Sequence, residues 1–245
     1  MSLTFSYYIC GCSKKQQMKL FVIEGIDGAG KSTQIKLLRD YFSGRGFSCE
    51  YLHFPRTDEP FFGELIGRFL RGEFGTAGEV DPYLVAMLYA GDRKDASGMI
   101  AGWLKKGTIV LLDRYTYSNI AYQCAKLDST AEQQKLMKWI LDLEFKHFGI
   151  PMPDLNIFLD VPFSFTEKKL LSQRTGDDRI YLNGTRDIHE ESLTFQNKVR
   201  EMYLKVAATD KRICVVNCST GKGEMLPEKH IFELIIKSLS QRNLL

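Results

Sequence analysis

Short apolar runs alternate along the chain with longer segments in which apolar residues recur every three or four positions. The apolar runs predict strands at residues 19–24, 48–54, 108–112, 155–159 and 212–216. The run at 108–112 is continuously apolar, which is typical of a strand covered on both faces, as in a parallel sheet.

The segments with helical periodicity come between these strands. The first predicted helix ends near Arg45, and the third runs from Pro82 through Arg93, with interruptions near Gly98 and Gly102. The others are expected at residues 61–70, 129–147, 163–172, 189–208 and 227–239. Strands that alternate with helices predict a three-layer α/β fold, with a five-stranded parallel sheet flanked by helices.

A glycine-rich loop follows the first predicted strand. Residues 25–32 read G-x-x-x-x-G-K-S and precede a helix, and this context is the one in which the pattern binds phosphate, as in the P-loop NTPase fold. The glycines let backbone N–H groups face a polyphosphate, and the helix N-terminus adds its positive end. We therefore expect a nucleoside triphosphate, which the family resemblance given below implies is ATP, to bind Gly25, Ile26, Asp27, Gly28, Ala29, Gly30, Lys31, Ser32 and Thr33.

Four side chains near this loop carry candidate chemistry. Lys31 is expected to reach the β- and γ-phosphates, and Ser32 to hold Mg²⁺. Asp113 ends the third predicted strand and can help to position Mg²⁺, directly or through water. Arg114 can bridge donor and acceptor phosphates, because a guanidinium group suits phosphoryl oxygens. We predict Lys31 and Arg114 as catalytic residues, and Ser32 and Asp113 as metal ligands.

The composition and the absence of other motifs exclude several classes of protein to which the chain could belong. A GTPase would need Asn-Lys-x-Asp, but the one Asn-Lys pair continues as N-K-V-R at residues 197–200, within a predicted helix. The net charge of +3 gives no strong field for nucleic acid, and no apolar run is long enough to cross a membrane. The six cysteines match no zinc spacing and are interpreted as free thiols of a cytoplasmic protein.

The first residues of the chain look foreign to the rest. Residues 1–17 are expected to be a disordered extension or a tag, with an alternative start at Met18. Residues 18–245 are expected to form a single kinase domain.

Four blocks, in this order, resemble the thymidylate kinases of the nucleoside monophosphate kinase superfamily. They are the P-loop with Asp27 inside it, F-P-R at 54–56, Y-A-G-D-R at 89–93, and D-R-Y at 113–115 continuing to S-N at 118–119 and Y-Q at 122–123. The resemblance runs from Met18 to the C-terminus and is best in the first three-quarters. It implies ATP-dependent phosphorylation of dTMP to dTDP with Mg²⁺, by a cytoplasmic homodimer.

The resemblance also implies how dTMP is bound. Arg56 matches the residue that holds the acceptor phosphate, and Arg114 lies beside it. Asp27 matches a carboxylate on the deoxyribose 3′-hydroxyl, for which Arg114 is a candidate counter-charge. Tyr122 matches a residue that lies against the sugar and leaves no room for a 2′-hydroxyl.

The thymine base is expected to meet a second group of side chains. Tyr89 matches the aromatic residue that stacks on the base, although packing within the helix would also explain it. Arg93, one helical turn further, matches the donor to a thymine carbonyl. Asn119 matches a residue near the thymine edge, with Ser118 as its companion.

A polar segment at about residues 173–188 matches the lid that closes over ATP in this family. Some members have an arginine inside the P-loop where this chain has Gly28, and members without it use lid arginines. We therefore predict Arg174 and Arg179 as catalytic residues, with Arg186 as the alternative. Residues 217–221 match the loop on the adenine side.

Two other functions stay open at this point. The chain could be a kinase of UMP, CMP or a nucleoside, against which Arg93 and Tyr122 weigh. It could also be a nucleotide-binding regulatory or scaffold protein that has lost catalysis, against which the intact Lys31 and Arg114 weigh.

Overall fold

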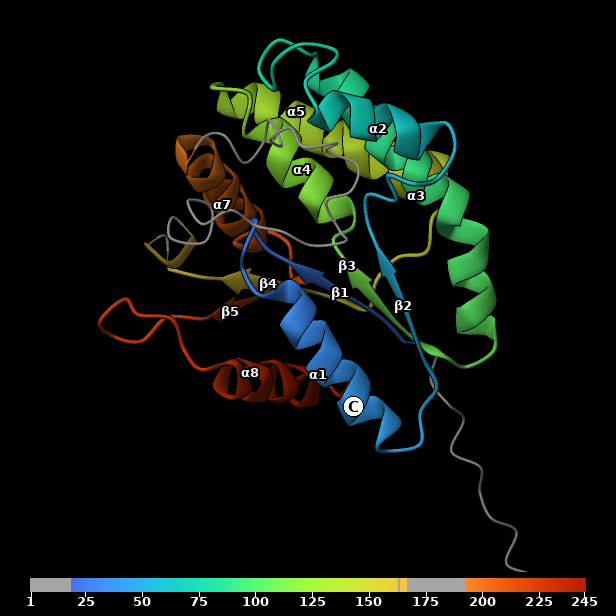
Figure 1. The fold of residues 1–245 in the computed structure, drawn as a ribbon, viewed down its shortest axis with the longest axis vertical. Coiled ribbons are helices and arrows are strands. Elements are labelled where there is room, and N and C mark those ends of the chain that lie inside the picture. The colour runs from blue at the N-terminus through green and yellow to red at the C-terminus, as the bar shows by residue number, and fades with distance from the viewer. Residues whose placement is uncertain (1–18, 163, 167–192) are drawn as a thin grey trace, which may run out of the picture.

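The computed structural model describes residues 19–162, 164–166 and 193–245. Its centre is a five-stranded parallel sheet, as predicted, and the strands lie in the order β2-β3-β1-β4-β5 (Figure 1). The strands are β1 (Lys19–Glu24), β2 (Cys49–His53), β3 (Ile109–Asp113), β4 (Leu155–Asp160) and β5 (Ile213–Asn217). β1 lies between β3 and β4, so the strand order reverses beside it, and ligands bind at the carboxyl edge of such a switch point.

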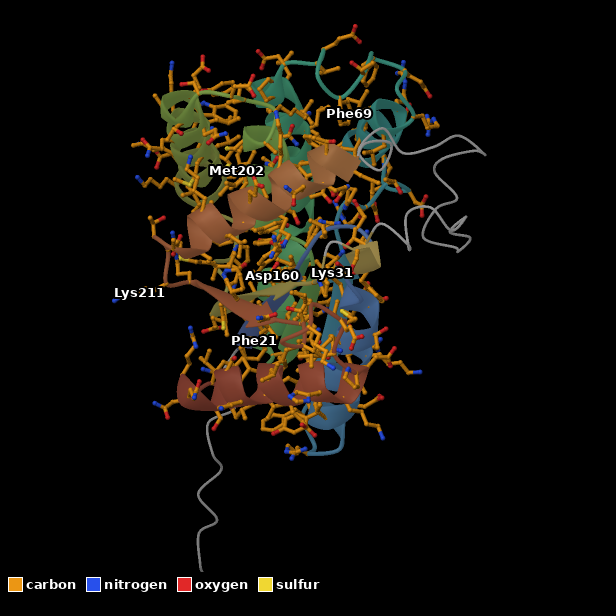
Figure 2. The ribbon with its side chains drawn as sticks, turned by 90° about the vertical axis from the view of Figure 1, so that its left-hand side faces the viewer. Phe21, Lys31, Phe69, Asp160, Met202 and Lys211 are labelled. Carbon is orange, nitrogen blue, oxygen red and sulfur yellow. The ribbon has the colours of Figure 1, made fainter. Side chains whose placement is uncertain are left out.

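Helices cover both faces of the sheet. They are α1 (Lys31–Ser43), α2 (Phe62–Leu70), α3 (Pro82–Lys105), α4 (Thr116–Cys124), α5 (Thr130–Leu141), α7 (Leu193–Ala207) and α8 (Glu228–Gln241), with a short π-helix, η1 (Asp142–His147), directly after α5. α1 packs with α8 on one face, and α4 packs with α3, α5 and α7 on the other (Figure 1). Figure 2 shows these layers from the side, with the fully buried Phe21 inside the molecule and the exposed Lys211 at its surface.

The helix at the third predicted position is longer than the sequence suggested. Asp81 caps it, since its carboxylate accepts hydrogen bonds from the backbone of Tyr83 and Leu84. The predicted interruptions at Gly98 and Gly102 are wrong, because α3 continues to Lys105. A glycine within a helix costs only about 1 kcal/mol. Buried apolar residues on the same helix, such as Ile100, offset that cost by packing in the core.

The helix α4 was not predicted. It has nine residues, and all nine are buried. Its polar residues, among them Ser118, Asn119 and Gln123, are buried as well, so they do not mark a solvent-exposed face. Its N-terminus is held by a residue distant in sequence, because Oε1 of Glu24 on β1 accepts from the backbone N–H groups of Tyr115 and Ser118, at 3.1 and 3.3 Å. This helix carries three of the residues assigned to dTMP, and it places them at the carboxyl edge of the sheet.

Replacing glycine by alanine is expected to change the stability of the protein in opposite directions at two positions of α3. A Cβ atom at the exposed Gly98 would have no neighbour within 4 Å, whereas at Gly91 it would lie 2.2 Å from a ring carbon of Phe62. We expect Gly98→Ala to raise the free energy of unfolding by about 0.5–1 kcal/mol, and Gly91→Ala to lower it by about 1–3 kcal/mol. Urea unfolding of both variants measures this. Equal effects at the two positions would contradict the packing of α2 against α3.

Among the residues that the structure describes, no helix is both long enough and apolar enough to cross a membrane.

Candidate active site

The glycine-rich loop connects β1 to α1. Gly28 and Gly30 have φ angles of 77° and 82°, which a residue with a side chain rarely adopts. They turn the chain so that α1 begins at Lys31. The Lys31 ammonium group donates to the carbonyl oxygen of Ile26 at 3.3 Å and lies 4.0 Å from Oδ1 of Asp113. Loop, lysine and strand-end carboxylate thus meet at one point, as predicted.

Asp113 is suited to hold a cation. Its side chain is buried, and its Oδ1 accepts no hydrogen bond from any residue that the structure describes. Burial would raise the pKa of Asp113, but Lys31, His53 and Arg114 together outweigh burial and lower it, so the carboxylate stays charged. Nδ1 of His53 lies 3.4 Å from Oδ2 of Asp113, a neighbour that the sequence reasoning missed.

The second predicted metal ligand, Ser32, is an exposed residue in the first turn of α1. Within the described ranges, no cluster of three or more His, Cys, Asp or Glu residues could enclose a metal. Mg²⁺ in kinases is held by one or two protein oxygens together with substrate phosphates, so the orphaned Asp113 oxygen and the Ser32 hydroxyl fit it.

Arg114 connects the glycine-rich loop to α4. Its Nη2 donates to Oδ1 of Asp27 at 2.7 Å and to the Tyr122 hydroxyl at 3.2 Å. The Tyr122 hydroxyl donates in turn to Oδ2 of Asp27 at 2.8 Å. The expected counter-charge for Asp27 is therefore confirmed as Arg114. Burial would lower the pKa of Arg114, but the nearby Tyr122 and Asp27 raise it well above its usual value.

The backbone at Arg114 is strained. Its φ of 66° lies in the left-handed region, which costs a non-glycine residue about 1–3 kcal/mol. Its backbone N–H is held by the carbonyl oxygen of Ile23, 3.0 Å away on β1. Strain of this kind collects at functional sites, where it aims a side chain that a relaxed backbone would not.

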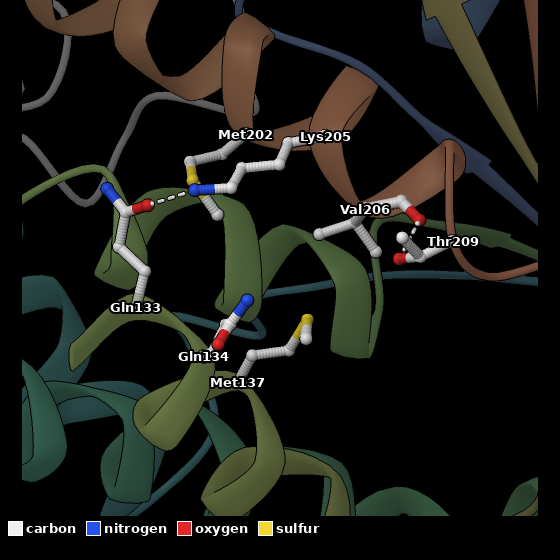
Figure 3. A pocket seen from close by; sticks show the side chains of 7 residues that line it. All are labelled: Gln133, Gln134, Met137, Met202, Lys205, Val206 and Thr209. Carbon is white, nitrogen blue, oxygen red and sulfur yellow. Dashed lines mark hydrogen bonds between the residues drawn. The ribbon is translucent and has the colours of Figure 1, made fainter. Parts of the chain in front are cut away.

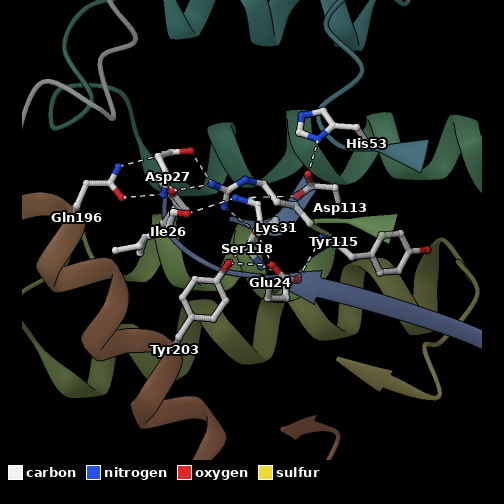
Figure 4. Close-up of polar contacts among 12 residues, drawn as sticks. Glu24, Ile26, Asp27, Lys31, His53, Asp113, Tyr115, Ser118, Gln196 and Tyr203 are labelled. Carbon is white, nitrogen blue, oxygen red and sulfur yellow. Dashed lines mark hydrogen bonds and ion pairs between the residues drawn. The ribbon is translucent and has the colours of Figure 1, made fainter. Parts of the chain in front are cut away.

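A helix from the far end of the chain also reaches the loop. Gln196 on α7 donates to Oδ2 of Asp27 at 3.1 Å and accepts from the Asp27 backbone N–H at 3.4 Å (Figure 4). The sequence reasoning missed this contact. Gln196 is separated from Asp27 by 169 residues, and nothing in its local pattern indicates the partner.

Ser118 on α4 contacts Arg114. Its hydroxyl accepts from Nη1 of Arg114 at 3.2 Å and lies within hydrogen-bond distance of Glu24 and Tyr203. Burial raises the pKa of Glu24, which also accepts from the backbone of Tyr115. The structure thus occupies the Ser118 hydroxyl with protein partners, and a contact with dTMP stays a prediction.

Arg56 lies just after the carboxyl end of β2, while Tyr89 packs within the helices and its contact with thymine stays a prediction. Arg56 follows β2, and its Nε donates to Oδ1 of the buried Asp92 at 2.7 Å. Oδ2 of Asp92 accepts from the Arg56 backbone at 2.9 Å, so one carboxylate fixes both the chain and the side chain. Tyr89 is partly buried against the cluster of Ile66, Phe69, Leu70 and Val85.

Arg93 is more deeply buried than a simple base-reading residue would be. It is 1% exposed, and it donates to both oxygens of the fully buried Glu144, at 2.6 and 2.7 Å. Asn119 donates to the same carboxylate at 3.0 Å and to the carbonyl oxygen of Ala86 at 3.0 Å. The structure therefore brings Arg93 and Asn119 together through Glu144, which the sequence reasoning did not single out.

Some predicted features lie outside the described residues. These are Arg174, Arg179 and Arg186 in the expected lid, and the extension at residues 1–17. In the expected adenine-side loop, the backbone and hydroxyl of Ser219 donate to Oδ1 of Asn217, at 2.9 and 2.6 Å.

A small pocket lies apart from this site, between α5 and α7 (Figure 3). It is lined by Gln133, Gln134, Met137, Met202, Lys205, Val206 and Thr209. Lys205 crosses it and donates to Oε1 of Gln133 at 2.8 Å (Figure 3). None of its lining residues belongs to the predicted site.

The fold and the site define a P-loop protein in which Arg114 joins the glycine-rich loop to α4. The family model described as thymidylate kinase matches residues 23–227. The chain belongs to the thymidylate kinase family.

Individual relatives agree with this assignment. The probable thymidylate kinase of Thermococcus kodakarensis is 35% identical over 204 residues, which cover 80% of this chain and 87% of that protein. The thymidylate kinase of Mycobacterium tuberculosis H37Rv is 32% identical over 189 residues, covering 77% and 86%. The solved thymidylate kinase of Candida albicans superposes with a TM-score of 0.68 at 26% identity and covers 93% of each chain.

Proposed function

We propose that this chain transfers the γ-phosphoryl group of ATP to dTMP and produces dTDP. Membership of the thymidylate kinase family supports the reaction. The observation that carries the residue roles is the bridge of Arg114 between Asp27 in the P-loop and Tyr122 on α4. One guanidinium group thereby lies on the boundary between the donor and the acceptor, where phosphoryl transfer needs positive charge.

On the donor side, the loop at residues 25–33 holds the triphosphate through its backbone N–H groups, and Lys31 stabilises charge on the β- and γ-phosphates. Ser32 and Asp113 would hold Mg²⁺, which neutralises developing negative charge on the phosphoryl oxygens when it is bound. The expected lid, at about residues 173–188, supplies Arg174 and Arg179, which would stabilise the same negative charge on the phosphoryl oxygens. Closure of the lid would exclude water.

On the acceptor side, Arg56 binds the dTMP phosphate, and Asp92 holds Arg56 in place at 2.7 Å. The attacking phosphate oxygen is already anionic, so the transfer needs no general base. Asp27 accepts from the 3′-hydroxyl of the sugar. Tyr89 stacks on thymine, while Arg93 and Asn119 meet its polar edge.

The protein acts as a cytoplasmic homodimer in this proposal. Free thiols at Cys49, Cys124, Cys214 and Cys218 suit a reducing compartment. Leu84 and Met87 are 57% and 44% exposed on neighbouring turns of α3 and offer an apolar face for a second copy. Analytical ultracentrifugation measures the oligomeric state, and a monomer at micromolar concentration would refute this part.

The reaction is tested by coupling ADP release to an optical readout with dTMP, dUMP, UMP and dCMP as acceptors. We expect dTMP to give the highest kcat/KM. A preference for UMP would replace the assignment with another nucleotide kinase. Binding of both ATP and dTMP without turnover would indicate a protein that has lost catalysis.

Tyr122→Ala is expected to relax the selection of the sugar. Tyr122 is held by Asp27 and Arg114, and its ring would occupy the space of a 2′-hydroxyl. Removing the ring should lower the ratio of kcat/KM for dUMP to that for UMP by about tenfold. The ratio for dTMP to dUMP is the internal control, because those two differ only at the base. An unchanged dUMP-to-UMP ratio would remove Tyr122 from this role.

A further inference from the structure

We propose that Glu144 is a positioning residue that fixes the hydrogen-bonding polarity of the base end of the acceptor site. The inference rests on the proposed function and adds to it a residue that touches no substrate itself. Through Arg93 and Asn119, Glu144 would make the site select a pyrimidine that carries an N3–H group, and reject cytosine.

Glu144 is satisfied entirely by protein donors. Its Oε2 accepts from Nε of Arg93 at 2.6 Å and from the Thr116 hydroxyl at 2.8 Å. Its Oε1 accepts from Nη2 of Arg93 at 2.7 Å and from Nδ2 of Asn119 at 3.0 Å. A carboxylate offers about four acceptor positions, and these four donors fill them. Glu144 therefore acts through its neighbours.

Glu144 pairs with the positive charge of Arg93 in the interior of the protein. Both side chains are almost completely buried. Burial alone would lower the pKa of Arg93, and the Glu144 carboxylate outweighs it, so the pKa is raised. The paired hydrogen bonds also fix the plane of the guanidinium group. Arg93 thus presents donors only, in one orientation.

Glu144 also determines which way the Asn119 amide faces. Nδ2 of Asn119 uses both of its hydrogens, one on Oε1 of Glu144 and one on the carbonyl oxygen of Ala86. Rotating the amide by 180° would bring its oxygen against both acceptors, so the orientation is imposed twice. Oδ1 of Asn119 is buried and accepts no hydrogen bond from the part of the chain that the structure describes.

A buried acceptor without a partner is destabilising unless a ligand supplies a donor. The N3–H group of thymine or uracil can donate to Oδ1 of Asn119, while their O4 accepts from Arg93. Cytosine reverses both features, since its N3 is an acceptor and its 4-amino group is a donor. The pair of residues that Glu144 holds is therefore complementary to thymine and uracil and opposed to cytosine.

The backbone that carries Glu144 is unusual as well. Glu144 lies in η1, the π-helix that follows α5. π-Helical turns are rare and frequently occur at functional sites. This turn places Glu144 in contact with side chains from both α3 and α4.

The test is Glu144→Gln, measured as kcat/KM for dTMP and dCMP in the coupled assay. A glutamine is isosteric, but its amide nitrogen is a donor and must face Arg93, Thr116 or Asn119. We expect the ratio of kcat/KM for dTMP to that for dCMP to fall about tenfold or more. The loss for dTMP should appear mainly in KM, because the base is remote from the transferred phosphoryl group.

Tyr117→Phe is the matched control. Tyr117 lies next to Thr116 on α4, and its hydroxyl donates to Asp210 instead of to Glu144. The Tyr117→Phe substitution removes a hydrogen bond of the same helix, and it should leave the ratio of kcat/KM for dTMP to that for dCMP unchanged. An unchanged ratio in Glu144→Gln would overturn the inference, while a wild type without activity on dTMP would overturn the proposed function instead.

Thr116→Val is the second variant for this test, to be used if the Glu144→Gln protein does not fold. It removes one donor to Glu144 and keeps the ion pair with Arg93 intact. We expect the same ratio to fall a few-fold. A Thr116→Val protein with the wild-type ratio would likewise contradict the positioning role.

Discussion

Lys31→Ala is expected to lower kcat by about 10³-fold, while the protein keeps its fold. The lysine is the first residue of α1 and lies 4.0 Å from Oδ1 of Asp113, so its ammonium group occupies the point where phosphate charge must be neutralised. Charge that develops in the transition state is stabilised by fixed groups, and alanine leaves none there. Single-turnover measurement of dTDP formation with saturating ATP and dTMP gives the rate of transfer.

Lys36→Ala is the control for this variant. Lys36 is an exposed residue on the same helix, away from the loop. Like Lys31→Ala, this substitution removes one positive charge from α1. It should leave kcat within about a factor of two of the wild type, since substitutions of exposed residues usually have small effects. Equal rates for Lys31→Ala and the wild type would refute the role of the P-loop lysine.

The sheet and the P-loop were predictable because their signals are local. The continuous apolarity of residues 109–112 reflects burial on both faces, and the glycines at 28 and 30 reflect positive φ angles. Asp113 and Lys31 then meet because parallel strands end at the same edge. Each of these inferences needs only neighbouring residues and the direction of a strand.

The partners of the predicted residues were not predictable in the same way. Gln196 and Glu144 each look like an ordinary polar residue of a helix, yet both are fully buried. Their roles depend on how helices distant in sequence pack together, and on the π-helical turn at Asp142–His147, for which the sequence has no distinct signal. The helix α4 was missed for a related reason, since its polar residues are buried with its apolar ones and its N-terminus is held by Glu24 on β1.

Arg114→Lys is the other substitution with a large expected effect. Arg114 uses two nitrogens at once, Nη2 on Asp27 and Tyr122 and Nη1 on Ser118. A lysine keeps the positive charge but has a single ammonium group, which cannot reproduce this fork and also face the phosphates. We expect kcat to fall about 10²-fold, with a higher KM for dTMP, because Asp27 loses the group that orients it.

Arg212→Lys is the matched control. Arg212 also forms a paired contact with a carboxylate, donating to Asp210 from Nε at 2.9 Å and from Nη2 at 2.6 Å. It precedes β5 and therefore lies at the amino edge of the sheet, opposite the site. If the fork geometry at Arg114 matters for transfer, only Arg114→Lys loses activity. If charge alone matters, Arg114→Lys retains most of kcat, and the bridge between the donor and acceptor sides has no catalytic role.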